Sequence, residues 1–158
     1  RVQAAVPLDI LFGGNSFDEE FGAEALAGAR AAILYLAAED GRWCSKPPQA
    51  ERNLFEISPA PSMEVRIAGA GHIDFVDFMS GINNLAFVAC PAGEARPADV
   101  RALATRYMVN WFQAQLQDNA AARDWLATAP PLPGIAQVRR RGLAAEQPGA
   151  AGHRKPRE

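Results

Sequence analysis

The stretch of the chain best suited to chemistry runs from Met63 to Phe78 and contains one of the two histidines, His72. Apolar residues alternate with charged ones along its first part, which is the period of a strand with one buried face: Met63, Val65 and Ile67 against Glu64 and Arg66. Gly69 and Gly71 then supply the backbone freedom for a sharp exit. His72 is therefore predicted to project from the carboxyl end of a strand.

This position favours a catalytic or binding role for His72, because ligands and catalytic groups of open α/β sheets gather at the carboxyl ends of strands. A histidine that only caps a turn would fit the same pattern. The stretch by itself leaves both interpretations open.

A histidine that acts as a general base needs a carboxylate on its far ring nitrogen, which fixes the tautomer and stabilises the imidazolium. Two earlier strand candidates end in an acid, the first at Asp9 and the second at Asp40. Neighbouring parallel strands lie about 4.8 Å apart, so Asp40 comes within reach of His72 if the second and third strands are neighbours. Asp9 would have to reach across a strand and is the runner-up. Asp40 is followed by glycine, so it is also a candidate turn residue.

Three strands and four helices are predicted around these residues. The strands are Val2–Leu11, Ala32–Ala37 and Met63–Ile67. The helices are Asp18–Ala29, Pro47–Ile57, Ala98–Gln117 and Ala120–Ala127. Their alternation predicts an α/β fold with a parallel sheet and right-handed crossovers.

Length and composition favour one domain. The chain has 158 residues, 49% of them hydrophobic, and no apolar run approaches the roughly 18 to 20 residues that cross a bilayer. Residues 137–158 carry six basic and two acidic side chains, which leaves a net charge of −6 on residues 1–136. We therefore expect no membrane span and no nucleic-acid partner. Residues 135–158, which offer little to bury, are predicted to be a disordered basic tail, with the folded part at 1–134.

An acid after a strand, then GAGHIDFVDF, then a long helix resembles the C-terminal third to half of an α/β-hydrolase. The likeness is greatest to the serine esterase and lipase group that includes platelet-activating-factor acetylhydrolase-like, cutinase-like and chlorophyllase-like enzymes. The triad of that fold runs serine, acid, histidine along the chain. Asp40 and His72 match its second and third members, and Asp9 matches the acid of the acetylhydrolase-like branch. The resemblance covers roughly Val2–Leu126.

The chain departs from that family in one essential part, because it has no G-x-S-x-G nucleophile segment. None of its serines stands between glycines: Ser16, Ser45, Ser58, Ser62 and Ser80. The resemblance thus implies a region that supplies the acid and histidine for hydrolysis of a carboxylic ester, with the serine outside this chain. We expect a partial domain that lacks the N-terminal half, arising from a truncated gene model or from a fragment. An inactive fragment would pair with the missing half or self-associate through its exposed sheet edge.

The two cysteines, Cys44 and Cys90, lie in loops that are predicted to leave the same sheet edge. A disulfide between them would tie the acid loop to the histidine loop, as in similar secreted esterases, and would imply a secreted or periplasmic protein. No signal-peptide pattern is visible in this chain. Two free buried thiols are the alternative.

No cofactor or metal is predicted. Gly69-Ala70-Gly71 lacks the third glycine and the following helix of a dinucleotide-binding turn. No metal site is predicted from His72, Asp74 and Asp77, because their spacing does not fit one. We expect these residues to form a solvated acidic turn instead.

Overall fold

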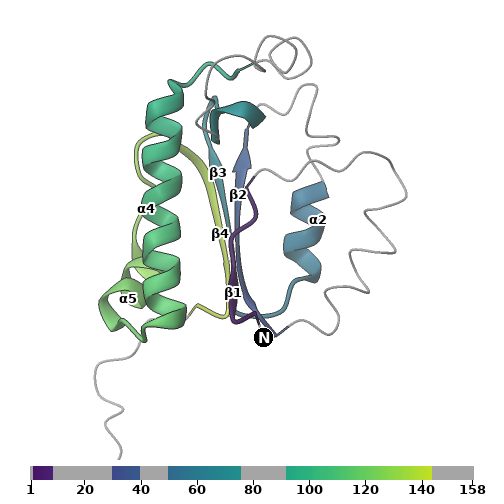
Figure 1. Ribbon diagram of the computed structural model, residues 1–158. Coiled ribbons are helices and arrows are strands. Elements are labelled where there is room, and N and C mark those ends of the chain that lie inside the picture. Colours follow the sequence, from purple (N-terminus) through teal and green to yellow (C-terminus); the bar gives the residue numbers. More distant parts are fainter. Residues whose placement is uncertain (1, 9–29, 40–49, 76–91, 144–158) are drawn as a thin grey trace, which may run out of the picture.

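The computed structural model describes residues 2–8, 30–39, 50–75 and 92–143. They form one mixed sheet of four strands in the order β1-β2-β3-β4, whose bounds are Ala4–Ala5, Ala32–Ala38, Ser62–Ile67 and Ile135–Arg141 (Figure 1). β1, β2 and β3 are mutually parallel, as predicted, whereas β4 is antiparallel to β3. The α/β architecture is confirmed, and the all-parallel sheet is not.

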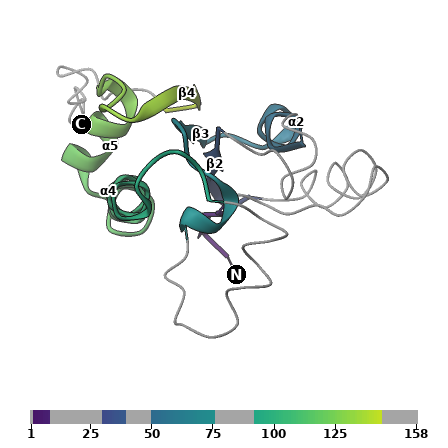
Figure 2. The ribbon, with the colours of Figure 1, turned by 90° about the horizontal axis from the view of Figure 1, so that it is seen from above.

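Helices lie on both faces of this sheet. The long α4 (Pro97–Leu116) and the shorter α5 (Ala120–Thr128) lie on one face, and α2 (Ala50–Ile57) lies on the other (Figures 1 and 2). A short 3-10 helix, η2 (His72–Phe75), follows β3. The sequence predicted α4 and α5 to within one residue at each end. None of the helices in the described ranges is both long and apolar enough to cross a membrane.

The main core lies between the sheet and α4. The helix buries one stripe at spacings of three and four residues, made by Val100, Ala104, Tyr107, Trp111 and Ala114. This stripe packs on the apolar side chains of β2 and β3. The apolar stripe of α4 and the sheet thus form the main core together.

The opposite face of β3 was expected to be solvated, and this expectation is wrong. All six residues of β3 are buried, and the charged side chains of Glu64 and Arg66 are 0% and 8% exposed. Both faces of β3 are therefore buried. Its apolar residues face the core under α4, and its charged residues lie in an ionic environment beside α2.

The predicted disordered tail begins too early, because residues 135–141 form β4. Pro133 and Gly134 do not end the domain. They form a turn in which Gly134 has a φ of +87°, and its carbonyl accepts a 2.8 Å hydrogen bond from the amide of Ala68. β4 is an edge strand among the described residues and buries few apolar side chains, which is why its composition resembled a tail. Residues 144–158 of the predicted tail lie outside the described residues.

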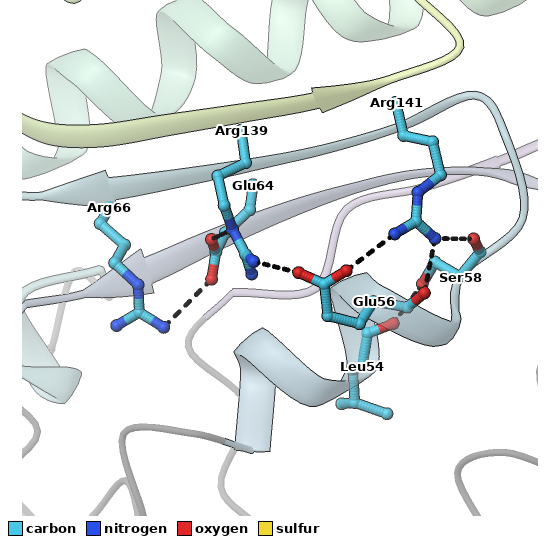
Figure 3. A network of polar contacts seen from close by, with 7 residues as sticks. All are labelled: Leu54, Glu56, Ser58, Glu64, Arg66, Arg139 and Arg141. Carbon is cyan, nitrogen blue, oxygen red and sulfur yellow. Dashed lines mark hydrogen bonds and ion pairs between the residues drawn. The ribbon is translucent and has the colours of Figure 1, made fainter.

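The arginine triplet of β4 makes specific contacts instead of belonging to a solvated tail. Arg139 stands opposite Glu64 in the antiparallel register and donates to its carboxylate, which also accepts from Arg66 at 3.0 Å (Figure 3). Arg139 and Arg141 both bind the carboxylate of Glu56 on α2. The buried charge of Glu64 is thus neutralised by two guanidinium groups, as a charge removed from water requires.

The same two arginines also cover α2 and cap its end. Arg139 and Arg141 lie over the ring of Phe55, with guanidinium carbons 4.3 and 5.1 Å from its centroid. Arg141 donates to the carbonyl oxygens of Glu56 and Ser58, where the helix leaves its carbonyls without partners. Cations are also favoured at this end of the helix dipole.

Arg140 points to the other face of the sheet, because successive side chains of a strand alternate. Its guanidinium donates to the carbonyl oxygens of Leu126 and Ala129, both at 2.7 Å, at the end of α5. One run of three arginines therefore joins helices on both faces of the sheet to its edge.

Two hydroxyl groups, those of Ser58 and Tyr35, form a buried hydrogen bond between the end of α2 and the sheet. Ser58 donates to the carbonyl oxygen of Leu54 at 2.6 Å, and its oxygen lies 2.6 Å from the hydroxyl of Tyr35 on β2. Since the single proton of Ser58 is used, Tyr35 is the donor to Ser58. Burial raises the pKa of Tyr35 above its ordinary value, against the opposing effect of this hydrogen bond.

We predict that Arg139→Ala destabilises the fold by about 2–4 kcal/mol. The variant removes one of two cations from a fully buried carboxylate, which is strongly destabilising even though Arg66 remains. The measurement is the free energy of unfolding in urea. Arg96→Ala is the matched control, because it breaks an exposed pair with Asp99 and should cost less than about 1 kcal/mol. Equal losses for the two variants would contradict the role given to Arg139.

Candidate functional site

β2 and β3 end together, which is the arrangement the candidate site requires. They are parallel neighbours, and Ala38 at the end of β2 pairs with Ile67 at the end of β3. The expectation that the second and third strands are adjacent is confirmed. Asp40 follows Ala38 by two residues and itself lies outside the described residues.

His72 is the first residue of η2 and lies just past the carboxyl end of β3. Its side chain is partly exposed, whereas the next three residues, Ile73, Asp74 and Phe75, are buried. Phe75 belongs to the main core. A partly exposed imidazole on a short helix anchored in the core can meet a substrate without leaving the fold.

The ends of β2 and β3 are joined by Glu39, a residue whose role the sequence did not indicate. Its backbone amide donates to the carbonyl oxygen of Ile67 at 3.2 Å. Its carboxylate accepts a 3.0 Å hydrogen bond from the amide of Gly69. The residue next to Asp40 is therefore bonded to the turn that leads to His72.

Asp74 was expected to lie in a solvated acidic turn, and this expectation is wrong. The residue is 1% exposed. Its Oδ2 accepts hydrogen bonds from the amides of Gly71 at 2.8 Å and Gly93 at 2.9 Å. Its Oδ1 is buried and has no hydrogen-bond partner among the described residues. Asp74 thus bonds the residue before His72 to the segment before α4.

The segment before α4 lies directly against the turn after β3. Ala95 donates its amide to the carbonyl oxygen of Gly69 at 2.8 Å. A Cβ at Gly93 would stand 2.1 Å from that same oxygen and 2.3 Å from the amide nitrogen of Gly71. Gly69 has a φ of +63°, which glycine adopts readily. The close approach therefore depends on glycine on both sides.

Of the site residues predicted from the sequence, the structure places His72. Asp40, the runner-up acid Asp9, and the candidate disulfide partners Cys44 and Cys90 lie outside the described residues. For these four residues the contacts stay predictions.

The described ranges contain no group of three or more His, Cys, Asp or Glu side chains that could hold a metal ion. An open groove of about 540 Å³ runs between the first turns of α4 and the turn before β4. Its lining includes apolar side chains, Ile67, Val100 and Leu103, and charged ones, Arg96, Asp99 and Arg106. His72 does not line this groove, so we place the candidate site at the strand ends instead.

Comparison of the sequence with models of known protein families gives no match, and a search of curated proteins gives none either.

We predict that Gly93→Ala separates the segment before α4 from the turn before His72. The added methyl group would overlap backbone atoms of Gly69 and Gly71, which cannot give way as a flexible side chain can. The expected loss is about 1–3 kcal/mol in the free energy of unfolding. Ala92→Ser, a change at an exposed neighbouring position, serves as the control. If Gly93→Ala is as stable as the control variant, the two segments are not held in this contact.

Proposed function

We propose that this chain supplies the histidine and the acid of a Ser-Asp-His triad in a serine-type carboxylic ester hydrolase. His72 is the general base and acid, Asp40 is its orienting carboxylate, and the nucleophilic serine comes from outside these 158 residues. The observation that carries the proposal is the register of β2 and β3, whose ends lie side by side. Loops that leave paired strand ends can bring Asp40 to His72.

In the proposed reaction, His72 accepts the proton of the serine hydroxyl as the serine oxygen attacks the ester carbonyl carbon. The tetrahedral intermediate collapses when His72 returns that proton to the departing alcohol, which leaves an acyl-serine. Water, deprotonated by His72, then releases the carboxylic acid and restores the serine. Asp40 holds the opposite ring nitrogen and stabilises the imidazolium in both steps.

The resemblance to esterases of lipids and polyesters supports a carboxylic ester as substrate, and the contacts of the described residues select no particular acyl or alcohol part. The proposed reaction itself uses no cofactor. We also propose that the protein is secreted or periplasmic. This part of the proposal rests only on the predicted disulfide between Cys44 and Cys90.

The second candidate is a catalytically inactive module that associates through its sheet edge. The observation that favours it is the exposure of apolar side chains on the first segment, with Val2 68% and Leu8 37% exposed. β1 pairs with β2 on one side and is an edge among the four described strands. An apolar strand edge is a template for another chain. That chain would be the half of the fold that carries the serine, or a second copy of this chain.

The proposal is tested with a fluorophosphonate probe, which labels activated serines, followed by intact-mass analysis. We predict no added mass on the 158-residue chain, because none of its serines stands in a G-x-S-x-G segment. A longer product of the same reading frame that carries such a segment is predicted to gain one probe per chain. His72→Ala should abolish most of that labelling, by at least about 10³-fold in rate.

Two results would contradict the proposal. Labelling of the 158-residue chain that depends on His72 would show that one of its own serines is the nucleophile. A folded longer product that contains the serine segment and stays unlabelled would favour the inactive association module. Ser80→Ala serves as a control on the longer product, since the proposal gives Ser80 no role.

A further inference from the structure

We infer that Asp74 is a positioning residue that orients His72 through the backbone on either side of it, an inference that rests on the proposed role of His72. Asp74 belongs to the same short helix as His72 and stands two residues after it. Its role differs from that of Asp40, which is the proposed partner of the imidazole ring itself.

The hydrogen bonds of Asp74 hold the backbone around His72 in place. A single oxygen of Asp74, Oδ2, accepts from the amide of Gly71 at 2.8 Å and from that of Gly93 at 2.9 Å. The amide of Asp74 in turn donates to the carbonyl oxygen of Gly71 at 3.1 Å. Residues 71 to 74 are thereby closed into one hydrogen-bonded loop that contains His72. Rotation of the backbone at His72 would break at least one of these bonds.

The carboxylate of Asp74 is buried. A carboxylate in a site that is 1% exposed, with Oδ1 lacking a partner among the described residues, loses the hydration of that oxygen. An ionised oxygen compensates by accepting two amide bonds that are stronger than bonds to a neutral acceptor. These two hydrogen bonds form a rigid connection through Asp74. An exposed turn would not need an aspartate at this position.

The hydrogen bonds of Asp74 connect His72 to two other elements of the fold. Gly93 belongs to the segment that leads into α4, and Phe75 next to Asp74 is buried in the core beneath α4. Gly69, at the start of the turn, is bonded to Glu39 at the end of β2. The backbone of His72 is therefore fixed relative to both α4 and the exit of β2, where Asp40 follows.

The test uses the full chain labelled uniformly with 15N, and it records the ring nitrogen signals of His72 and the exchange of backbone amides. His153→Gln removes the signal of the second histidine. We expect Asp74→Ala to speed exchange of the Gly71 and Gly93 amides by about tenfold or more. The ring signals of His72 should move toward those of a histidine in an unstructured peptide, because the tautomer is no longer selected by a fixed partner.

Two controls separate positioning from general loss of stability. Arg139→Ala destabilises the fold without touching residues 71 to 74 and should leave the ring signals unchanged. Asp99→Ala removes an exposed carboxylate on α4 and should change neither measurement. If Asp74→Ala lowers stability but leaves the ring signals as in the parent chain, Asp74 is only structural and the inference is overturned.

Asp74→Asn keeps the test decisive if the alanine variant does not fold. The amide side chain retains one neutral acceptor, so the Gly71 and Gly93 amides should exchange faster and the ring signals should shift part of the way. Faster amide exchange with unchanged ring signals overturns the inference, and so does unchanged exchange.

Asp40→Asn, measured alongside, distinguishes failure of this inference from failure of the proposed function. Ring signals that respond to Asp74→Ala but not to Asp40→Asn would leave Asp74 as the positioning residue and remove Asp40 from the triad. The reverse pattern would retain the proposed triad pair and discard the role of Asp74.

Discussion

The buried carboxylate of Glu64 is the constraint on which the sheet depends. It is fully enclosed at the middle of β3, and a charge in that place must be paired. Arg66 from its own strand is one partner, and Arg139 supplies the other only if β4 lies antiparallel to β3 in the observed register. The same arginines hold α2, so one buried charge fixes an edge strand and a helix together.

β3 is also the strand that delivers His72, so its surroundings determine where the histidine lies. β2 fixes it on one side, β4 on the other, and α4 packs against η2, which follows it. The glycine-rich exit then passes against the segment before α4, where Gly93 admits a backbone approach that no side chain would allow. The precision of the site therefore derives from the packing of backbone on backbone rather than from a large apolar pocket.

The sequence predicted the elements whose periodicity is local, and it missed the ones that depend on distant partners. The apolar run of β2 and the stripe of α4 were enough to place both elements and to put His72 at a strand end. β4 was missed because its stability comes from contacts of its arginines with Glu56 and Glu64, more than 70 residues away. The burial of Asp74 was missed for the same reason, since its second amide partner is Gly93.

The central claim is that Asp40 meets His72 at the paired ends of β2 and β3, and a crystal structure of the full chain tests it most directly. The account predicts a carboxylate oxygen of Asp40 within roughly 2.6–3.2 Å of a ring nitrogen of His72. The other ring nitrogen should face the open edge of the sheet. An Asp40 carboxylate directed away from His72, or Asp9 bonded to the imidazole in its place, would contradict the account.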